Sequence, residues 1–166
     1  DKLPEIGTVG ELVIQTDKAE MYMEAIVVTM GIHNESDLNK MASVIKANNG
    51  AGYYALAKDI RCSGIYDANL DVEFVGTFDG RGNAIYNMTT SDREGSNRGL
   101  LGNSLGATGV VKNVAFVNAK HSGNGGFIAT NGAGAIKNVY IQIDIEYSEA
   151  KVTSILATYT FGVFST

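Results

Sequence analysis

The segment from Gly99 to Val139 contains nearly the same pattern twice. Each copy has a glycine-flanked apolar patch, then a turn of small residues, then an apolar residue followed by Lys-Asn-Val, at Val111–Val114 and at Ile136–Val139. This repetition, at a period of about 25 residues, constrains the fold more than any other feature of the chain, because such self-similarity is typical of units that stack on one another.

Two independent features recur at nearly this period. Asn87, Asn113 and Asn138 each follow an apolar residue by two positions. The glycine patch at Gly99 recurs at Gly126 and, less completely, at Ser154. Because a strand rises about 3.3 Å per residue, a repeat of this length suffices for three short strands and three turns that close one coil.

Stacking such coils about 4.8 Å apart gives a parallel β-helix, in which each coil buries its inward apolar residues against its neighbours. A leucine-rich repeat has a similar length, but its leucine-asparagine consensus is absent from this chain. A β-sandwich has turn signals at this density without a recurring register. The sequence therefore predicts an all-β fold, a parallel β-helix of a few coils.

Recurring residues stack in such a fold. We predict that Asn87, Asn113 and Asn138 form one column at a turn, where asparagine tolerates the left-handed conformation and its amide can bond to the next amide. The alternative is that each asparagine is only a good turn residue. Lys112 and Lys137 would stack as well, and we expect these like charges to splay into solvent. Joint binding of an acidic ligand by the two lysines is the other possibility.

The chain divides into three parts. In residues 1–33, a β segment of uncertain packing, Met21–Ile32 reads as a buried strand and Gly10–Thr16 as its possible partner. Residues 34–49 form the one convincing helix, which Ser36 can cap and which ends at the Asn-Asn-Gly of residues 48–50. Its apolar face comprises Leu38, Met41, Ala42, Val44 and Ile45. Residues 50–166 have short apolar runs between turn residues and are predicted to form the β-helix repeats.

Composition excludes several classes. A length of 166 residues, 45% of them hydrophobic, suits a single domain with an ordinary core. The net charge of -5 argues against nucleic acid and against an anionic membrane surface. No apolar run reaches the roughly 18 residues of a membrane span. The chain begins at Asp1 without a methionine or a signal peptide, so we expect a processed piece of something longer. The lone Cys62 is expected to be a small buried or half-buried hydrophobe.

Three stretches of the sequence resemble a known family. They are Gly99-Leu100-Leu101-Gly102, the segment from Glu35 to Ile60, and Phe74–Thr90 with its Phe-x-Gly-Thr-Phe-Asp-Gly-x-Gly pattern. Together they resemble bacterial cell-surface proteins with Gly-Leu-apolar-Gly (GLUG-type) repeats, which also occur in N-terminal regions of immunoglobulin-A-cleaving metalloendopeptidases. The resemblance runs from about Asn34 to Ile145. It implies a right-handed parallel β-helix whose first coil is covered by the short helix.

The chain departs from this pattern at two places. The glycine motif is intact once, since the later copies read Gly126-Phe127-Ile128-Ala129 and Ser154-Ile155-Leu156-Ala157. The N-terminal segment, 1–33, matches no known pattern.

Enzymes built on parallel β-helices need clustered aspartates, or basic residues with calcium, on one face of successive coils. Asp79, flanked by glycines, is instead expected to make an Asx turn, with catalysis or ion binding as lesser alternatives. Asp144 and Glu146 alternate with apolar residues, as on an exposed strand face, and Asp59 has no repeated partner. The sequence therefore predicts no catalytic residues.

The histidines fit no metal motif. His33 and His121 are far apart in sequence and are expected to be surface or turn residues. We predict no metal, no cofactor and no cofactor-binding residues. Asn34 and Asn87 lie in Asn-x-Ser/Thr sequons, which matter only if the source glycosylates secreted proteins.

These observations favour a noncatalytic extracellular module at the cell surface, an adhesin, stalk or ligand-presenting scaffold within a larger bacterial protein. Its partners would be a host or bacterial glycan or protein and the neighbouring domains of a longer chain, with no nucleic acid and no membrane insertion in this segment. Two alternatives stay open: an accessory N-terminal region of a surface metalloprotease and, less favoured, a carbohydrate-active β-helix enzyme.

Overall fold

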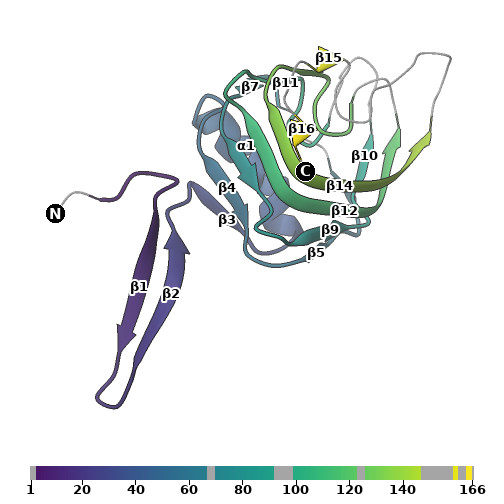
Figure 1. Ribbon diagram of the computed structural model, residues 1–166. Coiled ribbons are helices and arrows are strands. Elements are labelled where there is room, and N and C mark those ends of the chain that lie inside the picture. Colours follow the sequence, from purple (N-terminus) through teal and green to yellow (C-terminus); the bar gives the residue numbers. More distant parts are fainter. Residues whose placement is uncertain are drawn as a thin grey trace.

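The computed structural model describes residues 3–66, 70–91, 99–122, 126–146, 159–160 and 164–165. Within these ranges the chain forms one α-helix, α1 (Glu35–Ala47), and a series of mostly short strands (Figure 1). All strand pairs outside the N-terminal hairpin are parallel in the described residues, apart from one isolated bridge. The prediction of a mostly β chain with one short helix near its N-terminus is confirmed.

The N-terminal hairpin stands apart from the other strands. β1 (Val9–Gln15) pairs antiparallel with β2 (Glu20–Ile26) in a separate two-stranded sheet that projects from the rest of the molecule (Figure 1). The predicted partnership of these segments is confirmed. The prediction of one buried strand over 21–32 is wrong, because β2 is largely exposed and the apolar run continues as a separate strand, β3 (Met30–Ile32).

Helix α1 begins at a different residue than predicted. Asn34 has extended dihedral angles, and its Oδ1 accepts a hydrogen bond from the backbone N–H of Asp37 at 2.9 Å. Asn34 is therefore the N-cap, and Ser36, the predicted cap, already lies inside the helix. The predicted stop is confirmed, since Asn49 and Gly50 have φ values of 51° and 82° in the left-handed region.

The helix buries its predicted apolar face. Leu38, Met41, Ala42 and Ile45 are buried and Val44 is half-buried against the same core. Two polar contacts fix the helix to later segments. The Glu35 carboxylate accepts hydrogen bonds from the backbone N–H groups of Ser63 and Gly64 at 2.8 and 2.9 Å, and Lys46 pairs with Asp71 at 2.9 Å.

The largest sheet is built from segments far apart in the sequence. Its main path, in spatial order, is β16 (Phe164–Ser165), β14 (Ala135–Glu146), β12 (Val110–Ser122), β8 (Thr77–Asp79), β4 (Tyr53–Leu56) and β3. Tyr54, Phe78, Val111 and Ile136 occupy one register column across four of these strands. The column shows that the chain passes through the same sheet repeatedly and in the same direction.

Two further sets of parallel strands follow the same order. One pairs β5 (Ile60–Arg61), β6 (Ile65–Tyr66), β9 (Ala84–Tyr86) and β10 (Thr89–Ser91) with one another and with the long β12. The other is a four-stranded sheet of β7 (Glu73–Phe74), β11 (Ser104–Leu105), β13 (Asn131–Gly132) and β15 (Tyr159–Thr160). Each pass of the chain thus contributes strands to more than one sheet around a shared interior (Figure 1).

The glycine patches lie side by side as predicted. The N–H groups of Leu100 and Leu101 donate to the carbonyls of Phe127 and Ile128, each at 2.8 Å. The weaker copy, Ser154-Ile155-Leu156-Ala157, lies outside the described residues. Tyr159, two residues after it, pairs with Asn131 of the preceding pass.

The predicted column of three asparagines is wrong. Asn138 Nδ2 donates to Asn113 Oδ1 at 3.0 Å, but Asn87 accepts from Asn118 Nδ2 at 2.8 Å instead. The physical reason is that Ile85 pairs with Phe116, which sets Asn87 beside Asn118 and not beside Asn113. All four asparagines have φ between 50° and 57°, which confirms the expected left-handed turns.

Glycines mark the true register. The N–H of Val110 donates to the carbonyl of Gly76, and that of Ala135 donates to the carbonyl of Gly109, both at 2.9 Å. A Cβ on Gly76 would lie 2.4 Å from the Gly52 carbonyl oxygen, and one on Gly134 equally close to that of Gly109. Only glycine lets the backbones approach this closely where successive passes enter the sheet.

The interior between the sheets is apolar and aromatic. Phe74, Phe78, Phe116 and Phe127 are fully buried, and the rings of Phe116 and Phe127 meet edge to face at 5.1 Å between centroids. Burial of these side chains and of the α1 face supplies the main stabilisation, because each large apolar side chain removed from water contributes about 1.5–3 kcal/mol.

Candidate functional site

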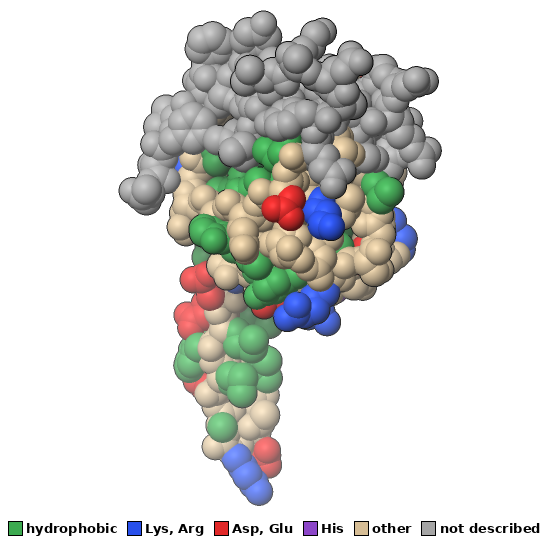
Figure 2. Space-filling view, turned by 90° about the vertical axis from the view of Figure 1, so that its right-hand side faces the viewer, with side chains coloured by type: hydrophobic (Ala, Val, Ile, Leu, Met, Phe, Trp, Pro, Cys, Tyr) green, Lys and Arg blue, Asp and Glu red, His purple; other side chains and the backbone are tan. Residues whose placement is uncertain are grey.

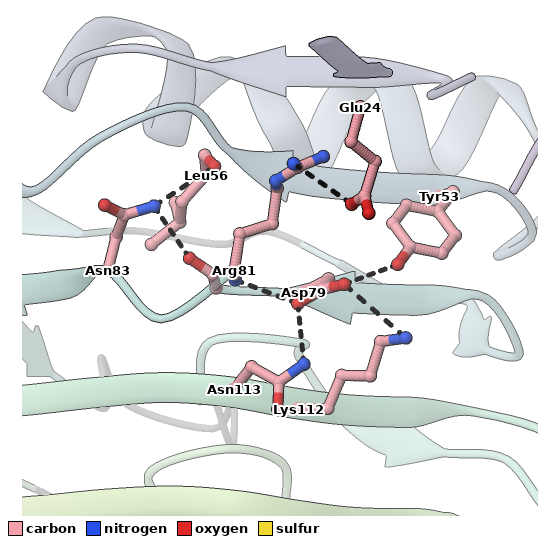
Figure 3. A network of polar contacts seen from close by, with 9 residues as sticks. Glu24, Tyr53, Leu56, Asp79, Arg81, Asn83, Lys112 and Asn113 are labelled. Atoms are coloured by element: carbon pink, nitrogen blue, oxygen red, sulfur yellow. Dashed lines mark hydrogen bonds and ion pairs between the residues drawn. The ribbon is translucent and has the colours of Figure 1, made fainter. Parts of the chain in front are cut away.

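The densest polar cluster of the described residues surrounds Asp79 at the end of β8 (Figure 3). Its side chain is buried, with 6% of the residue exposed. Oδ2 accepts a hydrogen bond from the Tyr53 hydroxyl at 2.5 Å and lies 3.5 Å from Lys112 Nζ. Oδ1 accepts from the Arg81 backbone N–H at 2.8 Å and from Asn113 Nδ2 at 3.3 Å. One carboxylate therefore joins β4, β8 and β12.

The bond from Arg81 N–H to the side chain two residues earlier is an Asx turn, and this prediction for Asp79 is confirmed. Arg81 itself has a φ of 53°. Its guanidinium lies 4.0 Å from the Glu24 carboxylate of β2, an exposed pair that links the hairpin to the rest of the chain (Figure 3). Exposed ion pairs of this kind contribute about 0–1 kcal/mol.

The contacts of Asp79 set its charge state. Burial raises the pKa of this carboxyl, but the bonds from the Tyr53 hydroxyl and the Arg81 N–H, with the Lys112 charge and the Asn113 amide, outweigh burial and hold the pKa below its ordinary value. Burial lowers the pKa of Lys112, and the bond to Tyr53 and the charge of Asp79 reverse that effect and leave it raised. Burial and the bond to Asp79 raise the pKa of Tyr53. The cluster is a compensated ion pair at neutral pH.

The stacked lysines do not both splay into solvent. Lys112 and Lys137 are register partners, as predicted. Lys137 is exposed, but Lys112 turns back to Asp79, with its Nζ 5.4 Å from the centre of the Tyr53 ring. The prediction of two solvent-directed lysines is wrong for Lys112, because the buried carboxylate one strand earlier attracts its charge.

A shallow groove of about 320 Å³ runs beside the asparagine pair. The lining residues are Gly82, Asn113, Val114, Ala115, Asn138, Val139 and Tyr140. Tyr140 is 60% exposed and is the register partner of Ala115, which in turn pairs with Ala84. The ring therefore stands beside two small side chains. The open space at Gly82, where a Cβ would meet no atom within 4 Å, continues the groove.

The two histidines differ from each other. His33 is exposed, as predicted, with Nδ1 3.5 Å from Asp37. His121 is 1% exposed in β12, and its Nδ1 lies 2.7 Å from the Thr90 hydroxyl of β10. The prediction of a surface or turn histidine is wrong for His121, because β12 continues through the apparent turn and directs this ring inward.

The remaining predicted positions have structural roles or are exposed. Asp59 Oδ1 accepts from the Ala84 N–H at 2.9 Å, and Asp144 is exposed on its strand as expected. The side chain of Glu146 lies outside the described residues. Cys62 is buried, as predicted, and burial, with the nearby Glu35 charge, raises the pKa of its thiol to about 11.

Neither sequon asparagine has a free amide oxygen. Asn34 uses its Oδ1 to cap α1, and Asn87 uses its Oδ1 to accept from Asn118. Both residues are exposed.

Within the described ranges, no three His, Cys, Asp or Glu side chains come close enough to hold a metal ion together. In the same ranges, the helix is not long and apolar enough to cross a bilayer. Sequence reasoning missed Tyr53 as the partner of Asp79. The Gly-x-apolar pattern of residues 52–54 and 76–78 aligns the two strands and places Tyr53 opposite Thr77, which is two residues from Asp79 and on the same face of its strand.

Comparison with known proteins gives one partial similarity. The chain is 39% identical over 71 residues to Halomucin of Haloquadratum walsbyi, a large cell-surface protein. The match covers 42% of this chain and 1% of Halomucin. No family model and no solved structure matches the chain. The similarity thus links a part of the chain to a cell-surface protein.

Proposed function

We propose that this chain is a noncatalytic module of a larger cell-surface protein, built as a right-handed parallel β-helix of a few coils that α1 covers at one end. The parallel register column through Tyr54, Phe78, Val111 and Ile136 is the observation that carries the proposal. The partial similarity to Halomucin supports the surface assignment. The resemblance to GLUG-type surface proteins agrees with both.

The contacts that both carboxylate oxygens of Asp79 already make support a noncatalytic role. A general base needs an oxygen that can accept a proton from substrate. Both oxygens of Asp79 already face two donors each, and its pKa is lowered further from neutrality. Asp59 is engaged by a backbone N–H, and Asp144 is exposed on a strand, where its register partner is Lys120. These acids thus fit structural roles better than acid–base catalysis.

The groove beside the asparagine pair is the proposed ligand face, and a glycan is the proposed ligand. An exposed aromatic ring gives a flat surface for the C–H face of a sugar, and side-chain amides donate to and accept from hydroxyl groups. Tyr140 supplies the ring, and Asn113 and Asn138 supply the amides. A few polar groups beside an apolar wall is the usual composition of a small-ligand site.

A glycan array combined with a lyase and hydrolase screen tests this function. We expect retention of one glycan class without any turnover. Tyr140→Ala should weaken that binding about tenfold or more, since it removes the ring, whereas Tyr22→Ala, which removes an equally exposed tyrosine from the hairpin, should leave it unchanged. Cleavage of a polysaccharide by the purified chain would overturn the noncatalytic assignment. Equal loss in both variants, or none in Tyr140→Ala, would overturn the site.

A further inference from the structure

The two faces of the β1–β2 hairpin differ in chemistry. Cross-strand partners share a face, so the register places Gly10 with Ala25, Leu12 with Met23 and Ile14 with Met21 on one side. We name these six residues the apolar hairpin face. The opposite side, the acidic hairpin face, contains Val9, Glu11, Val13, Gln15, Glu20, Tyr22, Glu24 and Ile26.

The apolar hairpin face is uncovered. Leu12, Ile14, Met21 and Met23 are 51%, 44%, 58% and 48% exposed, although each is a large hydrophobic residue. Figure 2 shows the projecting arm with hydrophobic side chains along its length. Contiguous apolar patches on an exposed element mark interaction surfaces, and a two-stranded ribbon alone is at best marginally stable in water. The hairpin therefore needs a second layer that the described residues do not supply.

We propose that this second layer is the same hairpin of another copy, so that two apolar hairpin faces stack in a homodimer. Stacking two sheets about 10 Å apart buries both inner faces and leaves the outer faces in water, as in a small β-sandwich. An isologous contact needs a surface that is complementary to itself. A flat face with aliphatic and thioether side chains meets that condition, because methionine adapts its shape to the opposing surface.

The charge distribution of the hairpin favours stacking through the apolar hairpin face over stacking through the acidic one. The apolar hairpin face has no charged residue, so a symmetric stack brings no like charges together. Stacking of the acidic hairpin face would oppose Glu11, Glu20 and Glu24 of one copy to those of the other. Glu24 of the acidic hairpin face also lies 4.0 Å from Arg81, so at this residue the acidic face meets the rest of its own chain (Figure 3).

The size of the face predicts a weak dimer. Both strands are short, at seven residues each. At about 3.4 Å per residue and about 10 Å of width for two strands, the face covers roughly 240 Å² per copy. This is well below the roughly 800 Å² per partner of a standard stable interface. We therefore expect association in the micromolar range or weaker, which tethering on a surface would strengthen through effective concentration.

Sedimentation of the full chain over a wide concentration range tests the dimer. The wild-type chain should change from monomer to dimer as its concentration rises from about 10 µM to about 1 mM. The double variant Leu12→Thr/Met23→Thr should stay monomeric, and threonine keeps the β preference of the strands. The control Val13→Thr/Tyr22→Thr alters the acidic hairpin face by the same number of apolar groups and should dimerise like the wild type. A wild-type chain that stays monomeric throughout, or a control variant that loses the dimer, would overturn the proposal.

Cross-linking provides a second readout, because the covalent bond traps even weak or short-lived association. Leu12→Cys and Val13→Cys place one thiol on each face, and Cys62, buried with its raised pKa, reacts slowly. A short bismaleimide should give covalent dimers with Leu12→Cys and not with Val13→Cys. Equal yields from the two variants would contradict the stack. Flotation of a monomeric wild-type chain with neutral phosphatidylcholine vesicles, abolished by Leu12→Thr/Met23→Thr, would assign the face to a membrane and would also overturn the dimer.

Discussion

At the scale of single residues, the contacts of Asp79 show how a buried charge is tolerated. Its carboxylate has donors from β4, from its own turn and from β12. Burying a carboxylate without such partners costs several kcal/mol, so the four contacts are a condition for placing an acid here at all. The same contacts hold three strands in register at one point.

Asp79→Asn should lower the free energy of unfolding at pH 7 by about 1.5–3 kcal/mol, because the variant leaves Lys112 without its counter-charge. The folded-state pKa of Asp79 lies below its unfolded value, so its contribution is fully present above the unfolded pKa and is lost as pH falls through the folded one. The gap between wild type and variant should therefore be constant from about pH 8 to 5 and shrink below about pH 4. Urea titrations across this range measure the gap, and a gap that widens on acidification would contradict the proposed charge state.

At the scale of elements, α1 shows how local chemistry decides a boundary that periodicity leaves open. The apolar spacing of the helix predicts its buried face correctly. Periodicity does not distinguish Asn34 from Ser36 as the cap, since both side chains can accept from a backbone N–H. The extended backbone of Asn34 decides the matter, because only a residue outside the helix can direct its side chain to the orphan donors.

Asn34→Ala should destabilise the chain by about 1 kcal/mol, whereas Ser36→Ala should change its stability by less than about 0.5 kcal/mol. The first variant removes the acceptor for the Asp37 N–H, and the second alters a residue of the first helical turn that makes no cap. Thermal unfolding of the two variants side by side measures the difference. A larger loss of stability in Ser36→Ala than in Asn34→Ala would indicate that Ser36, the cap predicted from the sequence, caps the helix.

Alanine substitutions at two glycines test how closely the backbones of successive passes of the chain lie. Gly76→Ala should cost about 1–3 kcal/mol, because the new methyl would lie 2.4 Å from the backbone oxygen of Gly52, where the main chain cannot easily move aside. The matched change Gly10→Ala, at a glycine with nothing within 4 Å of its added Cβ, should leave the stability nearly unchanged. Denaturant midpoints of both variants provide the comparison. Equal midpoints would mean that successive passes of the chain are not packed this closely.

At the scale of the whole molecule, the sequence predicts stacking better than it predicts register. The pairing of Asn113 with Asn138, and of the Gly99 patch with the Gly126 patch, follows from a nearly constant period. Asn87 does not follow it, because the pass from Phe78 to Val111 is longer than the pass from Val111 to Ile136. A longer loop changes the spacing without changing the stack, and loop length is not constrained by packing of the core.

The sequence predicts the burial of the second hairpin strand and the surface position of His121 incorrectly, for related reasons. An alternating apolar strand reads as buried, since the pattern shows that one face is apolar and not that anything covers it. His121 lies among Gly, Ser and Asn, which indicate a turn, but tertiary pairing with β10 and β14 extends the strand through it. The candidate groove combines residues from three passes of the chain, so it could not be predicted before the register was known.

Backbone couplings across hydrogen bonds test the central claim most directly. In a uniformly ¹⁵N,¹³C-labelled sample, the stacked parallel arrangement predicts three trans-hydrogen-bond couplings: Thr77 N to Gly52 C′, Val110 N to Gly76 C′, and Ala135 N to Gly109 C′. Detection of all three would establish that four successive passes of the chain lie one on another in this register. Couplings from these amides to other carbonyls, or to antiparallel partners, would contradict it.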